Sequence, residues 1–195
     1  MRTRLGGSAG NSRLTALTAI VLLVLLAIEG GTLLSLQTFL SWHIVVGMLL
    51  VPIVALKLVT VGYRFARYYT NRREYVEAGP PTTLLRLLGP VVVLATVGLF
   101  ATGVALAVLG PGAPFVLLLH KASFAVWVAA MTVHVLAHVL ELPPLAAGDL
   151  RGDGVGGSHL RVGLLAGVIV AGAVLAIATL PLVSPWVHWM RDARG

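Results

Sequence analysis

The sequence contains no cysteine and few charged residues, and each shortage excludes a class of protein. With no cysteine among 195 residues, disulfide bonds, thiolate metal sites and covalent haem attachment through Cys-x-x-Cys-His are excluded. Charged residues make up only 11% of the chain, whereas soluble domains carry about 25%. Hydrophobic residues make up 58%, and the mean hydropathy is +0.96. The composition therefore predicts an integral membrane protein and no soluble domain.

Five apolar runs are long enough for the roughly 20 residues that a transmembrane helix needs. They are Leu14–Leu36, Phe39–Val61, Leu87–Leu109, Pro114–Leu140 and Val162–Val183. The basic residues before the first run are typical of a signal peptide, but no small-x-small cleavage site follows, so we expect a retained helix. The predicted fold is all-α, an up-down four-helix bundle over residues 14–140 plus a fifth transmembrane helix over residues 162–183.

Positive charge is concentrated in alternate segments between these runs. Ten arginines lie in the N-terminal tail, the second loop and the fourth loop: Arg2, Arg4, Arg13, Arg64, Arg67, Arg72, Arg73, Arg86, Arg151 and Arg161. The positive-inside rule accounts for the net charge of +7, so nucleic acid is not predicted as a partner. We expect a cytoplasmic N-terminal tail (residues 1–13), a cytoplasmic loop (141–161) and an outer C-terminal tail (184–195).

Three histidines lie on one face of the fourth run. His120 and His134 are 14 residues apart, and His138 follows four residues later. At about 100° per residue these spacings bring all three imidazoles to one side of a helix. Ionisable groups inside an apolar span are costly and usually functional. This face is therefore the first candidate for a site.

A fourth histidine, His43, is predicted to lie at the same membrane depth as His120. His43 lies near the start of the second run, which should cross the membrane in the same direction as the fourth. Facing histidines from two bundle helices can provide both axial ligands of haem b, so we expect one haem near the outer surface. Gly47, one turn below His43, would leave space for a flat macrocycle. The alternative is that both histidines are interfacial, with buried ring bodies and wet tips.

The inner half of the membrane offers a less complete set of groups. Lys57 lies on the face of His43 and near the depth of His134, either extending to the cytoplasmic surface or pairing with a haem propionate or quinone oxygen. His134 and His138 could be alternative haem ligands, or one ligand and one proton carrier. With Glu141 they form H-x-x-x-H-x-x-E, which could also hold a divalent metal ion.

Glu29 is the only acidic residue in the first run, and its predicted depth is close to that of His43. It could orient an imidazole, pair with Lys121 or relay a proton to a quinol. The alternative is a helix-end carboxylate that water reaches through Gly30-Gly31.

These motifs resemble the bacterial di-haem cytochrome b superfamily. That superfamily includes cytochrome b561-type proteins and the cytochrome b subunits of formate dehydrogenase and nickel-iron hydrogenase. The resemblance covers residues 14–140 and depends on Trp42-His43 with Gly47, and on His120-x3-Phe124-x2-Trp127-x6-His134. It implies a protein of the cell's inner membrane that carries electrons between quinone and a redox partner or membrane complex. Non-covalent haem b would be the cofactor, with quinone as a second ligand.

Carried over by position, the resemblance implies that His43 and His120 ligate an outer haem and that His134 serves an inner one. The sequence departs from the family pattern at Lys57, where the second run would need its other histidine. One haem is therefore expected and a second is left open. No substrate-converting site is evident, so an electron-transfer subunit is favoured over a stand-alone enzyme.

Two other function classes remain open. A transporter or metal permease would use His134, His138, Glu141, Lys57 and Glu29 along its pathway. A cofactor-free scaffold subunit would tolerate replacement of its histidines with no loss beyond stability.

Overall fold

The computed structural model describes residues 4–77, 79, 83–151 and 154–192, and within these ranges helices joined by short turns are its only regular secondary structure. The elements in chain order are α1 (Gly7–Thr32), η1 (Leu33–Ser35), α2 (Leu36–Tyr69), α3 (Arg73–Val76), α4 (Thr83–Leu109), α5 (Pro114–His138), η2 (Val139–Glu141), α6 (Leu142–Leu150), α7 (Ser158–Ala178), η3 (Leu180–Val183) and α8 (Ser184–Asp192). The all-α prediction is confirmed for the described residues.

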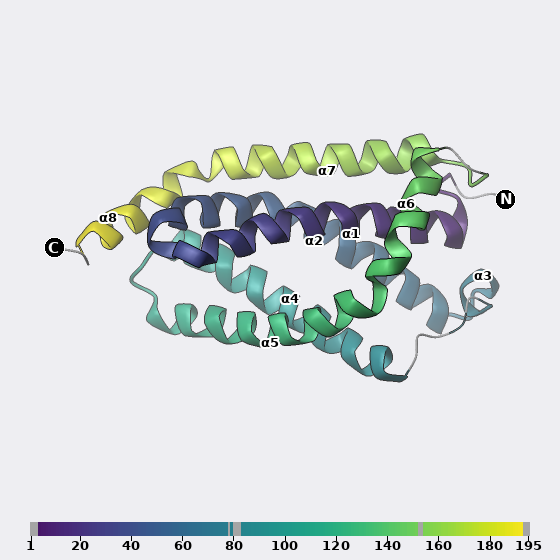
Figure 1. Cartoon of the computed structure of the whole chain (residues 1–195), viewed down its shortest axis with the longest axis horizontal. Helices are drawn as coiled ribbons and strands as arrows, with labels where there is room; N and C mark the ends of the chain where they lie inside the picture. Colours follow the sequence, from purple (N-terminus) through teal and green to yellow (C-terminus); the bar gives the residue numbers. More distant parts are fainter. Residues whose placement is uncertain (1–3, 78, 80–82, 152–153, 193–195) are drawn as a thin grey trace.

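Four helical stretches are long and apolar enough to cross a membrane. They are Gly7–Tyr69, Arg86–Leu109, Pro114–Gly148 and Ser158–Ala178. The first stretch contains both α1 and α2, which turn back on each other at η1 and lie side by side (Figure 1). The prediction of a helical membrane protein is therefore confirmed at the level of length and composition.

The helices run in alternating directions, so the connections gather at two ends (Figure 1). One end, here called the η1 end, contains η1, the α4–α5 turn and α8. The other, the α3 end, contains the N-terminal segment, α3 and the α6–α7 loop. Helices α2 and α5 run in the same direction, as the sequence predicts, and this places the starts of both helices at the η1 end.

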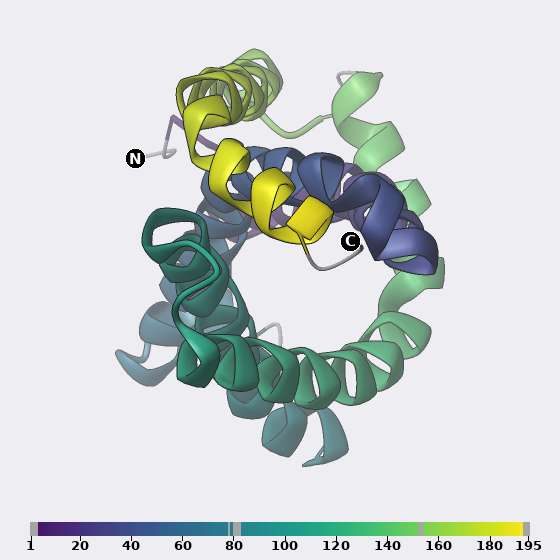
Figure 2. The same cartoon turned by 90° about the vertical axis from the view of Figure 1, so that its left-hand side faces the viewer.

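The packing order differs from a simple four-helix bundle. Helix α5 packs along α4, α1 along α2, and α7 along α2 and α1. The α1–α2 pair therefore lies between α7 and the α4–α5 pair (Figure 2). Helix α7 lies on the outer side of the α1–α2 pair and packs so closely on α2 that a Cβ at Gly172 would clash with the Leu49 carbonyl oxygen. Small residues such as Gly172 and the buried Ala176 allow this close approach of two helices.

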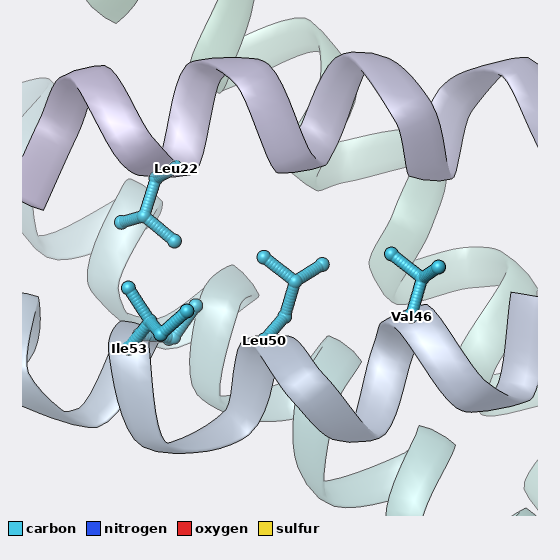
Figure 3. Packing of buried hydrophobic residues seen from close by; sticks show 5 residues of the cluster. Leu22, Val46, Leu50 and Ile53 are labelled. Carbon is cyan, nitrogen blue, oxygen red and sulfur yellow. The ribbon is translucent and has the colours of Figure 1, made fainter. Parts of the chain in front are cut away.

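The tightest apolar core lies between α1 and α2. Leu22, Val46, Leu50, Ile53 and Val54 form one buried cluster, four of which are labelled in Figure 3. They recur at helical spacings, so the face that α2 turns to α1 is continuous. This core fixes the register of α2 against α1.

Three predicted loops or tails are partly helical. Helix α1 begins within the predicted tail 1–13, α6 lies in the predicted loop 141–161, and α8 occupies most of the predicted tail 184–195. Pro143 and Pro144 fall in the first turn of α6, where proline costs little because those N–H groups have no helical partner. Trp186 of α8 is buried, and its Nε1 donates to the Leu106 carbonyl oxygen at 3.2 Å. Arg2 and Arg194 lie outside the described residues.

A buried arginine closes the α3 end. The Arg161 side chain, at the start of α7, has no exposed surface. Its guanidinium donates to the carbonyl oxygens of Leu5 at 2.8 Å, Gly156 at 2.8 Å and Val155 at 3.2 Å. Gly157 precedes the helix with φ +89°, and a Cβ there would lie 2.3 Å from the Arg4 carbonyl oxygen. Arg161 thus ties the N-terminal segment to the α6–α7 loop.

Candidate functional site

The two histidines predicted at one depth lie next to each other near the η1 end. His43 comes from α2 and His120 from α5, and both are half-buried. Their ring centroids are 6.5 Å apart, and the ring planes are inclined by 78°. The structure therefore brings together the imidazoles of two residues that are 77 positions apart in the sequence.

Helix α1 supplies the groups that hold the His43 ring. His43 Nδ1 lies 2.9 Å from Glu29 Oε1 and 3.1 Å from Thr32 Oγ1. Thr32 Oγ1 in turn donates to the Glu29 carbonyl oxygen at 2.5 Å. A carboxylate can only accept, so the Nδ1 proton is assigned to this contact. The Nε2 lone pair of His43 then points away from α1.

Helix α4 holds the His120 ring in the same way. His120 Nδ1 lies 3.2 Å from the Leu99 carbonyl oxygen and 3.1 Å from Thr102 Oγ1. Because a carbonyl oxygen can only accept, Nδ1 must carry the proton in the neutral ring, and Nε2 carries the lone pair. Among the described residues, neither His43 Nε2 nor His120 Nε2 has a hydrogen-bond partner.

This arrangement fits one iron between the two rings. Two imidazoles that bind the same metal through bonds of about 2 Å have ring centres roughly 6 Å apart. The observed 6.5 Å between His43 and His120 is close to that value. Histidines that ligate metals usually donate their other ring N–H to a carboxylate or carbonyl, and both rings do so here. The two rings therefore have the spacing and the Nδ1 partners that two histidines sharing one metal ion would need.

Glycines on α4 make room for the side chains of α5. A Cβ at Gly103 would lie 3.2 Å from His120 Cε1, and one at Gly98 would lie 3.1 Å from Ser123 Oγ. Further along, Trp127 Nε1 donates to Thr96 Oγ1 at 3.1 Å. The α5 face that the sequence predicts is therefore turned to α4 rather than to lipid.

Gly47 borders the candidate site on the side of Glu29. A Cβ there would lie 3.5 Å from Glu29 Oε1, an ordinary contact distance. The space at Gly47 thus adjoins the carboxylate that holds His43. The second carboxylate oxygen, Glu29 Oε2, is buried and has no hydrogen-bond partner among the described residues. A buried acceptor without a donor is costly, so this oxygen is available to a further hydrogen-bond donor at the site.

The residues predicted for the inner half of the membrane do not form a facing pair like that of His43 and His120. Lys57 Nζ donates to the Thr15 carbonyl oxygen of α1 at 2.9 Å, so its amino group is held within the helices. The rings of His134 and His138 are 5.0 Å apart, and His138 Nδ1 lies 3.3 Å from Glu141 Oε2. In the described part of the chain, no group of three or more His, Cys, Asp or Glu residues is placed to hold a metal ion.

Sequence reasoning missed three of the groups that hold the histidines. Thr32, Thr102 and the Leu99 carbonyl were not predicted, and the only signal for the threonines was a hydroxyl within an otherwise apolar helix. Glu29 was considered as an imidazole partner, and the structure shows that contact. Lys121, its other candidate partner, is exposed.

The chain matches no protein-family model, no curated protein and no solved structure. The case for any function therefore depends on the geometry of the chain itself.

Proposed function

We propose that this protein is a membrane b-type cytochrome that carries electrons between a quinone pool and a redox partner. His43 and His120 would hold one haem b at the η1 end. The observation that supports this most directly is the 6.5 Å between the two rings, each with its Nδ1 held by an acceptor. The resemblance of residues 14–140 to di-haem cytochromes b points to the same chemistry.

Haem b held by His43 and His120 would supply one-electron redox chemistry. The chain would contribute the rest. Glu29 and Thr32 fix the His43 ring. Leu99 and Thr102 fix the His120 ring. Since both histidines would ligate the iron, electron transfer rather than oxygen chemistry would be the role of this site.

We further propose five membrane crossings, with α1 and α2 as separate spans. Nine of the ten arginines, all but Arg2, lie in or next to the connections at the α3 end, so that end would face the cytoplasm and the η1 end the outside. The haem would then lie near the outer surface of the inner membrane. His134 remains the candidate ligand for a second haem. Its second protein ligand would have to be His138 or Lys57, whose side chain would need to reorient to reach the iron.

The test is a reduced-minus-oxidised absorption spectrum of the detergent-purified protein, with a pyridine haemochrome count. We expect a sharp b-type α-band and about one haem per chain, since one facing pair of histidines is in place. A count near two would place a second haem at His134. A colourless protein from haem-replete cells would overturn the proposal and favour a transporter or a scaffold subunit.

Glu29 gives a prediction for the reduction potential. In Glu29→Gln the amide removes a negative charge that favours the oxidised, more positive iron, so the midpoint potential should rise. The amide oxygen can still accept from His43 Nδ1, so what is lost is the charge assistance, and a difference of about 1 kcal/mol corresponds to roughly 40 mV for one electron. A spectroelectrochemical titration measures this shift directly.

The matched control is Glu141→Gln at the α3 end, where the carboxylate contacts His138 instead of His43. We expect its potential to stay at the wild-type value. A Glu29→Gln potential that is unchanged, or lower than the wild type, would show that Glu29 does not act on the haem through His43.

A further inference from the structure

A cavity of about 590 Å³ opens at the α3 end, far from the histidine pair. Its walls come from the N-terminal segment, α1, α2, α3 and α7. None of the residues proposed for the haem site lines it. The cavity is therefore a separate feature that electron transfer does not explain.

Positive charge dominates the mouth of this cavity. Four arginines line it, Arg4, Arg67, Arg72 and Arg73, and Glu74 is the one acidic residue among the lining residues described. Arg73 Nε is paired with Glu77 Oε1 at 2.7 Å. Within the described ranges, no carboxylate forms an ion pair with Arg4, Arg67 or Arg72. The lining thus presents three guanidinium groups that have no carboxylate partner within the described part of the chain.

One of these arginines is held in place by an aromatic side chain. Arg67 Nε donates to the Tyr63 hydroxyl at 2.9 Å, and its guanidinium carbon lies 5.1 Å from the Tyr63 ring centroid. Tyr63 in turn contacts the buried Tyr75 of α3, with ring centroids 6.1 Å apart. A planar guanidinium fixed in this way is well suited to bind phosphate oxygens.

Below the arginines the cavity wall is apolar. Leu14 of α1, which is buried, lines this part of the wall. Leu56 of α2 also lines it, one turn before Val59 and Thr60. Val59 is 66% exposed and Leu164 of α7 is 41% exposed, so this side opens onto the surface that would face lipid. A free inorganic ion would leave that apolar wall uncovered.

We propose that this cavity binds one anionic phospholipid. Its phosphate would lie among Arg4, Arg67 and Arg72, and an acyl chain would cover Val59 and Leu164. A basic pocket between transmembrane helices, with apolar surface directly below it, is the arrangement that holds an anionic headgroup together with its chain. In the proposed topology this lipid belongs to the cytoplasmic leaflet.

The test is native mass spectrometry of the detergent-purified full chain titrated with phosphatidylglycerol, phosphatidylcholine or inorganic phosphate. We expect one tightly bound phosphatidylglycerol per chain and at least about tenfold weaker binding of phosphatidylcholine, because each arginine near an anionic lipid contributes substantially to the attraction. The double variant Arg67→Gln/Arg72→Gln should weaken phosphatidylglycerol binding by roughly tenfold or more.

The control is Arg64→Gln/Arg151→Gln, which removes the same charge from exposed arginines that do not line the cavity. It should bind phosphatidylglycerol as the wild type does. Circular dichroism shows whether each variant folds. If the double variant does not fold, the single variant Arg72→Gln, at an exposed position, replaces it in the titration.

Equal loss in the two double variants would overturn the proposal, because binding would then follow total charge and not this cavity. Inorganic phosphate that displaces phosphatidylglycerol at equal concentration would also overturn it and would identify the ligand as a free anion. Neither readout depends on haem, so the cavity and the proposed function are tested separately.

Discussion

Replacing His120 with alanine is expected to yield a folded protein without its b-type absorption band. The iron would keep only His43 as a protein ligand, and the ring that contacts Leu99 and Thr102 would be gone. Loss of an outer-shell partner alone costs about 10- to 100-fold in metal affinity, so loss of an axial ligand should reduce haem content by more than about tenfold. His43→Ala should give the same result, because both ligands serve one iron.

Two further variants serve as controls for this prediction. His188→Ala, in α8 at the same end of the molecule, should keep the full haem content because His188 is exposed and away from the pair. His134→Ala should also keep it if one haem is bound, and should lose about half of it if two are. Full haem content in both His43→Ala and His120→Ala would exclude this pair as the site.

Replacing Arg161 with leucine is expected to cause the largest loss of stability. The leucine would leave three partly buried carbonyl oxygens, those of Leu5, Val155 and Gly156, without their guanidinium donor. Hydrogen bonds to a charged group are worth about 1.5–3 kcal/mol each, and we expect a total loss of about 3–5 kcal/mol because some carbonyls will find water. For a chain of this size that corresponds to a fall in melting temperature of roughly 10 °C.

Thermal unfolding in detergent, followed by circular dichroism, measures the change. Arg151→Leu is the matched control, since Arg151 is exposed and lies in the same connection between α6 and α7. Its melting temperature should differ from the wild type by no more than about 2 °C. An Arg161→Leu protein as stable as Arg151→Leu would show that the N-terminal segment is held by other contacts.

The sequence by itself determined the membrane character, the helical class and the faces that carry the histidines. Hydropathy and the 3.6-residue period are local properties, so His120, His134 and His138 could be assigned to one face of α5 before its neighbours were known. The alternation of basic and uncharged connections gave the direction of each helix, and therefore the parallel course of α2 and α5. His43 and His120 could be expected at one depth for the same reason.

Only the tertiary structure decided which groups hold those histidines. Whether Nδ1 of His120 meets the Leu99 carbonyl depends on how α4 is rotated and shifted against α5, and Gly98 and Gly103 permit that approach. Every residue has a main-chain carbonyl, so the residue type at position 99 does not indicate that its carbonyl accepts a hydrogen bond from His120. The same holds for Arg161, which appears in the sequence as one more basic loop residue but binds three carbonyls. Contacts between segments distant in the chain depend on helix register and packing, which local sequence patterns do not specify.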